Sequence, residues 1–492
     1  MAVVGLIILI LYSFVALAAP MITPYNPERD IVAGQYAPPS WYRYFPGGRG
    51  LSENTVLDAR PGFYTDPSND KAWQLTGDTA HISETFDPKV SSQTGSGSER
   101  IILNRSSGPL TGNYTATFEK VFDWPYEGPP GGFTGTLSIL TPTATAQEPV
   151  YVTLHIRRLG SDARAWDLTS NANVGAGAPN PSWSNFPFVS NQGWQKPSSI
   201  DSNDVTLQSL VGVSNLDASG VIFSSKNQYA YGVTVTFTSA SASTAPLTVY
   251  LDDVNLKLVG TSWGLLGTDT YGYDIWSQLL YGTRVSLEVG LLSAFIGITV
   301  GLGVGLMAGY LGKIVDEVLM RFTDMLLVIP GLPLLIVLVA VLGNQIGSSR
   351  LVVLILVIGF LGWMGFARVV RAQVLSLKER PFVEAAKAAG AGPGHIVGRH
   401  VVPNIVGLIY VNLALAVPGA ILAEAALSFL GLGDLTVASW GRMLNQVEEN
   451  SAQAVWWWVV PPGLSIALVS LAFVLIGFSL DTLFNPRLRQ RR

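Results

Sequence analysis

The sequence contains no cysteine and only four histidines among its 492 residues. Without cysteine the chain can form no disulfide, no thiolate nucleophile and no cysteine-ligated metal site. The histidines form no HExxH motif and the carboxylates do not cluster, so we expect no catalytic metal site. Charged residues are also scarce, at 13% of the chain, roughly half the share that is usual in soluble proteins. This scarcity, with a mean hydropathy of +0.35, indicates a membrane protein.

Length and net charge narrow the class further. A chain of 492 residues is too long for one ordinary domain, so we expect at least two units. The formal net charge of −4 gives no sign of nucleic-acid binding.

Long apolar runs predict six membrane-spanning helices. A span needs roughly 20 mostly apolar residues. Residues 2–19 form the first run, and five more follow a long polar stretch. They lie at about 286–310, 325–343, 350–368, 404–429 and 455–479.

The first run has a second interpretation. The sequence Ala16-Leu17-Ala18 resembles a signal-peptidase site, which would make residues 2–19 a cleaved signal peptide. No basic residue precedes the run, however, so we favour an uncleaved first span.

Basic residues predict the orientation of these spans. Six spans place both termini on one side of the membrane. If that side is cytoplasmic, the cytoplasmic segments hold most of the basic residues, including Lys313, Arg321, Lys378, Arg380 and the arginines of the tail. The short segments on the other side hold only Arg284, Arg350 and Arg442. Cytoplasmic segments carry the excess of Lys and Arg, so we expect cytoplasmic termini and an extracytoplasmic polar insert.

The insert, residues 25–258, reads as a separate β domain. Short stretches such as 150–159 and 231–240 alternate apolar and polar residues between turn residues, the pattern of half-buried strands. Many short strands without a helical period predict an antiparallel sandwich or jelly roll.

The last strand of the insert, "VYLDDVNLKL", resembles that of galactose-binding-like and carbohydrate-binding jelly rolls. The resemblance implies sugar stacking on exposed aromatic rings, and it allows a structural calcium ion. The aromatic candidates are Trp73, Trp124, Tyr126, Trp166, Trp183 and Trp194. The alternative is that these rings fill the sandwich core. Asp252 and Asp253 are expected to be structural, because alternation sends neighbouring residues to opposite faces.

A charged, alanine-rich stretch interrupts the apolar runs at residues 382–404. Pro381 suits the first turn of a helix, and Gly390 suits its C-terminal cap. Pro393 opens a second helix, and Pro403 is expected to end it before the next span. We therefore predict a cytoplasmic helix–turn–helix lying across the membrane surface.

This stretch resembles the EAA signature of ABC-importer permeases. Glu384-Ala385-Ala386, Gly390 and Pro403 match it in spacing, and "AEAALSFLGLG" (423–433) and "ASWGRMLNQ" (438–446) match further family stretches. The resemblance is closest to the second permease subunit of dipeptide, oligopeptide and nickel importers, and it covers all but the insert. It implies the fold of a type I ABC importer permease, carrying peptides or a related small solute.

The resemblance also implies a mechanism and a set of partners. A coupling loop, which we call the EAA loop (residues 376–404), would dock on a cytoplasmic ATPase. Glu384 would be its polar anchor, Gly390 its turn, and Ala385, Ala386 and Ala389 its packing surface. The partners would be a second permease in a heterodimer, two ATPase subunits and an extracytoplasmic solute-binding protein.

The chain itself is not expected to hydrolyse ATP. Its pair Gly312-Lys313 lacks the earlier glycine of a P-loop and is followed by Ile314, so ATP and magnesium belong to the ATPase partners. Two carboxylates in or near spans, Glu288 and Glu424, are candidates for the pathway or a gate.

The predicted organisation is a first span (1–24), the insert (25–258), a permease core (259–482) and a basic tail (483–492) in a prokaryotic inner membrane. Two other functions remain open: an oligosaccharide importer whose insert binds glycan, and a membrane-anchored glycan-binding protein. The EAA loop argues against a simple anchor, which needs no coupling element.

Overall fold

The computed structural model describes residues 2–57, 73–92, 97–106, 108–160, 163–168, 193–194, 200–204, 207–208, 211–212, 218–240, 244–343, 350–434 and 436–484. The chain forms two compact units. The membrane unit comprises Met1–Ile31 and Tyr273–Arg492, and the insert comprises Val32–Gly272. Residues 25–31, which were predicted to belong to the insert, lie in the membrane unit. Residues 259–272, which were predicted to belong to the permease core, lie in the insert.

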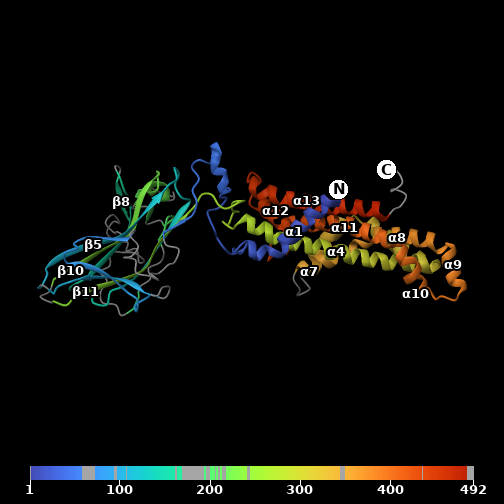
Figure 1. Cartoon of the computed structure of the whole chain (residues 1–492), viewed down its shortest axis with the longest axis horizontal. Coiled ribbons are helices and arrows are strands. Elements are labelled where there is room, and N and C mark those ends of the chain that lie inside the picture. The colour runs from blue at the N-terminus through green and yellow to red at the C-terminus, as the bar shows by residue number, and fades with distance from the viewer. Residues whose placement is uncertain are drawn as a thin grey trace. The chain divides into compact units, whose positions relative to one another are not determined.

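The membrane unit is a bundle of apolar helices (Figure 1). Five helices of the described chain are long and apolar enough to span a membrane, and a bent pair raises the number to six. The five contain α1 (Ala2–Ile22), α4 (Ile275–Leu311), α7 with α8 (Arg350–Leu361, Trp363–Lys378), α11 (Val402–Phe429) and α13 (Trp456–Phe484). The shorter helices are α9 (Pro381–Ala388), α10 (Pro393–Ile396) and α12 (Trp440–Glu449).

The first helix is packed into this bundle. A Cβ atom on Gly5 would lie 2.8 Å from the carbonyl oxygen of Ala472, and the Tyr12 hydroxyl donates to Ser465 Oγ at 3.2 Å. Residue numbers rise along α1 while they fall along α13, so the two helices are antiparallel. The start of α1 and the end of α13 therefore lie at the same end of the bundle.

A row of glycines brings α4 against α7 and α8. A Cβ atom added to Gly301 would lie 2.7 Å from the carbonyl oxygen of Trp363. Cβ atoms on Gly305 and Gly309 would lie 2.6 and 2.7 Å from the Cβ atoms of Val370 and Val374, respectively. The row, spaced by four residues, is Gly297, Gly301, Gly305 and Gly309. Residue numbers rise together in both helices, so α4 and α8 run parallel. The small-residue spacing in the sequence therefore marks close helix contact.

The predicted span at 325–343 is broken in the structure. It is divided between α5 (Lys313–Val328) and α6 (Gly331–Leu342), which are bent by 91°. Ile329 is extended, and Pro330, with φ −58° and ψ 123°, precedes α6. Proline disfavours helical geometry in the residue before it, which accounts for the break at this point.

The insert consists of two antiparallel sheets around one core. The first sheet has the order β3 (Ile82–Asp87), β4 (Ser98–Leu103), β11 (Leu247–Val259), β6 (Gly132–Leu140) and β9 (Ile200–Asp201), with β1 (Thr55–Val56) also paired to β11. The second has the order β2 (Trp73–Gly77), β5 (Gly112–Trp124), β10 (Asn227–Ser239), β7 (Val150–Arg158) and β8 (Arg164–Asp167). Short helices in the described part of the insert include η1 (Ser40–Tyr44), η2 (Pro46–Gly48) and α3 (Ser219–Ile222).

Apolar side chains from both sheets meet between them. Phe118, Val233 and Leu154 face Ile101 and Leu251 within one buried cluster. The predicted all-β sandwich is therefore present.

The predicted alternation fails at Asp252 and Asp253. Both side chains are buried. Asp252 accepts a hydrogen bond from the Ser92 backbone N–H at 2.8 Å, and Asp253 accepts one from the Ser92 hydroxyl at 2.7 Å. The pairing with β6 shifts between Asp252 and Asn255, and Asp253 has φ +53°. A β-bulge inserts an extra residue and interrupts the two-residue period, which explains why the prediction of opposite faces was wrong.

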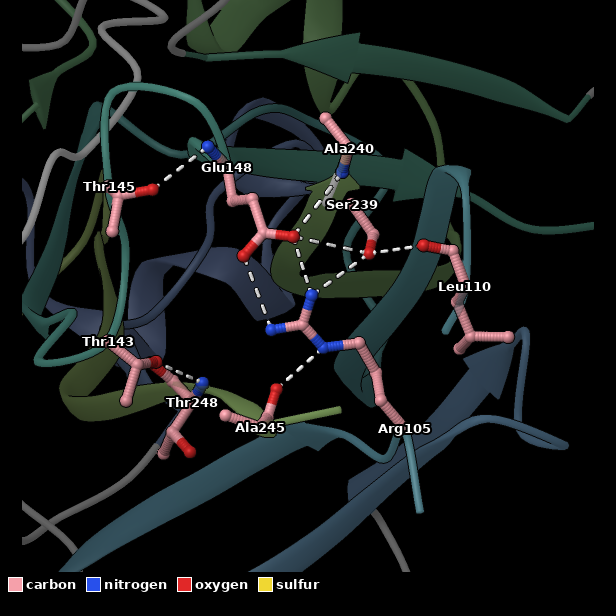
Figure 2. A network of polar contacts seen from close by, with 9 residues as sticks. All are labelled: Arg105, Leu110, Thr143, Thr145, Glu148, Ser239, Ala240, Ala245 and Thr248. Carbon is pink, nitrogen blue, oxygen red and sulfur yellow. Dashed lines mark hydrogen bonds and ion pairs between the residues drawn. The ribbon is translucent and has the colours of Figure 1, made fainter. Parts of the chain in front are cut away.

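A buried ion pair joins loops of the sandwich (Figure 2). The Arg105 guanidinium lies 2.5 Å from Glu148 Oε1, and it also donates to the carbonyl oxygen of Ala245 at 2.6 Å and to Ser239 Oγ at 3.1 Å. Glu148 Oε1 additionally accepts from the Ala240 N–H at 3.3 Å. Arg105 therefore has partners in two separate segments, and this compensates for the burial of its charge.

Candidate functional site

The EAA loop connects α8 to α11. Figure 1 shows α9 and α10 at one end of the bundle, with α12 at the other. Arg380 is extended and precedes Pro381, which opens α9. Proline is well suited to the first turn because its missing N–H has no intrahelical partner there.

Gly390 ends α9 by the predicted left-handed turn. Its φ is +82°, its N–H donates to the Lys387 carbonyl at 2.9 Å, and the Ala391 N–H donates to the Ala386 carbonyl at 3.0 Å. These two bonds form a Schellman motif, which satisfies the last carbonyls of the helix. Ala386 and Ala391 both pack on the apolar cluster below the loop, the contact that usually accompanies this motif.

Three apolar side chains that were not predicted from the sequence fix the loop to the bundle. Val383, Ile396 and Val401 are buried in one cluster with Val370 and Val374 of α8. Their sequence signal is weak, because single apolar residues stand among small and charged ones. They anchor the loop, so its position follows that of α8.

The predicted docking residues lie mostly on the other side of the loop. Glu384, Ala385, Ala389 and Gly390 are exposed, whereas Ala386 is half-buried. Glu384 also lies in the first turn of α9, where a carboxylate is stabilised by the helix dipole. Helix α9 of the loop thus presents a surface of small residues with one carboxylate, Glu384.

Pro403 does not end the second helix of the loop, which corrects the sequence prediction. The helix continues from α10 through a π-helical segment, η4 (Val397–Val401), into α11, with Pro403 in the first turn of α11. A proline ring would collide with the carbonyl of Arg399 in a regular α-helix. The wider π turn just before Pro403 removes this conflict.

Glu424 lies at the opposite end of the bundle as a buried helix contact. It is 1% exposed, and its carboxylate accepts from the hydroxyls of Ser428 at 2.7 Å, Ser439 at 2.8 Å and Ser286 at 3.4 Å. Ser439 is also the N-cap of α12, accepting from the Arg442 N–H at 3.2 Å. Glu424 therefore joins α4, α11 and the start of α12.

Glu288 does not meet Glu424. It is exposed on α4 and lines a polar cavity of about 510 Å³ with Arg29, Tyr281 and Arg284. The structure thus separates the two predicted carboxylates into a buried and an open environment.

Three of the six predicted glycan-contact aromatics belong to the core of the insert. Trp73 stacks on Phe118 with centroids 4.7 Å apart, and Trp124 is fully buried. Trp166 is also buried, within 6 Å of two arginines. Burial leaves these three rings no face for a sugar. Tyr126 and Trp194 are half-buried, so sugar contact at these two rings stays a prediction. Trp183 lies outside the described residues.

The second sheet carries a polar face away from this core. Glu119 of β5 accepts from Arg157 Nε at 2.9 Å and lies 3.3 Å from His155 Nε2 on β7, with Gly232 of β10 between the strands. Burial raises the pKa of Glu119, but the hydrogen bonds from His155 and Arg157 lower it more, so the pKa lies below its usual value.

No group of three His, Asp or Glu side chains suited to a metal is present among the described residues. The calcium ion that the sequence resemblance allows stays a prediction.

Two family models match the chain. One, described as "Binding-protein-dependent transport system inner membrane component", matches residues 301–490. The other, "N-terminal TM domain of oligopeptide transport permease C", matches residues 1–39. Neither match covers residues 40–300, which include nearly all of the insert.

Individual proteins agree with these models. The dipeptide transport system permease protein of Bacillus subtilis is 37% identical over 241 residues, covering 49% of this chain and 73% of that protein. A Brucella suis protein named as a peptide transport system permease is 39% identical, covering 46% and 74%. A solved carbohydrate-binding module of a β-sandwich superfamily shares 11% identity at a TM-score of 0.24, over 40% of this chain and 63% of its own.

The two models cover α1, the last part of α4, the helices from α5 to α13 and the EAA loop. Permeases of this kind are transport subunits and not enzymes, and separate ATPase subunits of the complex hydrolyse the ATP. The chain therefore belongs to the family of binding-protein-dependent transport system inner membrane components and is a multi-pass permease subunit of an ABC importer.

Proposed function

We propose that this subunit forms part of a translocation pathway for peptides and receives the work of ATP hydrolysis at its EAA loop. The observation that carries the coupling role is the two-sided construction of that loop. Val383, Ile396 and Val401 fix it to the bundle, while Glu384, Ala385 and Ala389 remain exposed. The peptide class is supported by the names of the relatives in Bacillus and Brucella.

We further propose the composition and orientation of the complex. This chain pairs with a second permease in a heterodimer, with two cytoplasmic ATPase subunits that use ATP and magnesium, and with an extracytoplasmic binding protein. Both termini and the EAA loop face the cytoplasm, and the insert faces the other side. The support is the excess of Lys and Arg in the segments assigned to the cytoplasm.

Replacing Glu384 by lysine tests the coupling role. The change reverses the charge of the exposed anchor and places a cation at the positive end of α9. In the complete transporter reconstituted with its binding protein, we expect Glu384→Lys to abolish ATP-dependent peptide uptake while membrane insertion stays intact.

The matched control is Glu449→Lys, an exposed carboxylate at the end of α12, away from the EAA loop. It should transport like the wild type. Normal uptake by Glu384→Lys would remove the coupling role.

A second candidate function is an oligosaccharide importer whose insert binds glycan. It is favoured by the half-buried rings of Tyr126 and Trp194 on the insert. The full transporter, applied to a glycan array with and without calcium, tests it. Glycan binding that is lost in a Trp194→Ala variant would support this function, and calcium-dependent binding would support the ion. A membrane-anchored glycan-binding protein would bind glycan equally well with Glu384→Lys and show no uptake at all.

A further inference from the structure

A polar cavity opens in the membrane unit at the end away from the EAA loop. Its volume is about 510 Å³, within the range of roughly 300–1,000 Å³ typical of small-molecule sites. Four segments line it: the stretch after α1, one face of α4, the start of α7 and the turn before α12. These segments are far apart in the sequence, so the sequence alone does not predict the cavity.

Charged side chains from two of these segments lie around the cavity. Arg284 and Glu288 are one turn apart on α4, and both are exposed. Arg29 comes from the stretch after α1 and is exposed as well. Glu28, beside it, is already ion-paired with Arg442.

Three of these charges are not neutralised within the part of the chain that the structure describes. Within the residues that the structure describes, Arg29, Arg284 and Glu288 have no ion-pair partner. Even Arg284 and Glu288, at the favourable i and i+4 spacing, are not paired. The cavity thus offers two free guanidinium groups and one free carboxylate to a ligand.

We propose that this cavity binds a short peptide by its termini, with Arg284 and Arg29 holding the terminal carboxylate and Glu288 the terminal ammonium group. This inference rests on the proposed function and specifies where the cargo first contacts the permease. Arginine suits a carboxylate because its planar fork donates two parallel hydrogen bonds. A neutral sugar would leave all three charges uncompensated, so the charge pattern selects a zwitterion.

The remaining lining fits such a ligand. The Tyr281 hydroxyl can donate to a peptide carbonyl, and the Thr436 hydroxyl, which donates to Asp434, can still accept from a peptide N–H. Val285 and Leu351 provide apolar surface for small side chains. Recognition of the termini and the backbone alone would let one site accept many short sequences.

Equilibrium binding of radiolabelled dialanine to the complete transporter in nanodiscs, without the binding protein, tests the proposal. We expect saturable binding that weakens at least tenfold in Arg284→Gln. Dialanine with an amidated C-terminus should bind at least tenfold more weakly to the wild type, with no further loss in Arg284→Gln, because both changes remove the same interaction. Arg321→Gln, at an exposed ion pair on α5, is the matched control and should leave binding unchanged.

Absence of saturable binding to the wild type would overturn the proposal, and so would an equal loss for dialanine and its amide in Arg284→Gln. ATP-dependent uptake of dialanine with the binding protein present separates this result from the proposed function. Uptake without Arg284-dependent binding would reject the cavity alone. Binding that depends on Arg284, in a transporter unable to take up any peptide, would reject the peptide-import function and keep the site.

Discussion

At the scale of single residues, a charged cluster on the second sheet stabilises the folded insert. Glu119 is 5% exposed, and its carboxylate is held by Arg157 and His155. Its pKa is lowered, so the cluster stabilises the fold at pH values above the unfolded pKa of about 4.3. That stability is lost as the pH falls through the lower pKa of the folded state.

Replacing Glu119 by glutamine should remove this acid dependence. We expect Glu119→Gln to destabilise the insert at neutral pH by about 1.5–3 kcal/mol, the usual contribution of a hydrogen bond to a charged group. Scanning calorimetry between pH 3 and 7 measures the effect. The wild-type transition temperature should fall below pH 4.5 more steeply than that of the variant.

Glu127→Gln, at an exposed carboxylate, is the control and should follow the wild type. The same slope in the wild type and Glu119→Gln would mean that the cluster contributes no stability.

Residue-scale prediction from the sequence succeeded where one residue type determines the geometry. Gly390 was expected to cap a helix, and it does so with positive φ. Pro403 was expected to stop a helix, and Asp252 and Asp253 were expected on opposite faces; both expectations failed. A π turn and a β-bulge are small backbone adjustments chosen by the packing around them, and no local pattern records that choice.

At the scale of elements, substitutions in the Schellman turn of the EAA loop can test the effect of one backbone angle, the φ of Gly390. A Cβ atom on Gly390 would meet nothing within 4 Å, so a substitution there costs only the strain of positive φ. That strain is roughly 1–2 kcal/mol for an ordinary L-residue and less for asparagine.

We therefore expect uptake to decrease in the order wild type, Gly390→Asn, Gly390→Ala, Gly390→Val, because each step makes the loop geometry harder to hold. ATP-dependent uptake by the reconstituted transporter measures the order. Gly394→Ala, which also adds a methyl group in open space but lies in α10 without positive φ, should be neutral. Equal activity of Gly390→Val and the wild type would show that the turn is not needed for coupling.

Element boundaries were predictable only from apolar runs. The span expected from about residue 286 begins at Ile275, because Asp274 caps the helix by accepting from the Ser277 N–H at 2.9 Å. The first turns of α4 mix apolar residues with polar ones, and they were not recognised as part of the span. Arg284 and Glu288, near the predicted boundary, reach the cavity, a long-range contact that the sequence does not reveal.

At the scale of the whole molecule, the insert interrupts the membrane unit at a single point in the sequence. The chain leaves the membrane unit after Ile31 and returns at Tyr273, and these two residues form an antiparallel bridge. Their Cα atoms are therefore about 5 Å apart, close enough for a two-residue turn to join them.

Replacing residues 32–272 by Asn-Gly should leave a folded permease. We expect this variant to insert in the membrane and to assemble with its partners, because the membrane unit keeps its own contacts. Size-exclusion chromatography and thermal unfolding of the purified transporter check this. Removing residues 25–258 instead should give a less stable protein, because it deletes Glu28, the partner of Arg442. Aggregation of the 32–272 variant would show that the membrane unit depends on the insert.

The glycine row of α4 has a mechanical consequence. α4 and α8 touch backbone to backbone along several turns and run in the same direction, so we expect the two helices to move together. α8 leads directly into the EAA loop, whereas α4 extends for 37 residues, or about 55 Å, and carries Arg284 and Glu288 near its other end. A push delivered at the loop would therefore displace the pair as a single rigid rod, and the cavity would change shape in the same movement.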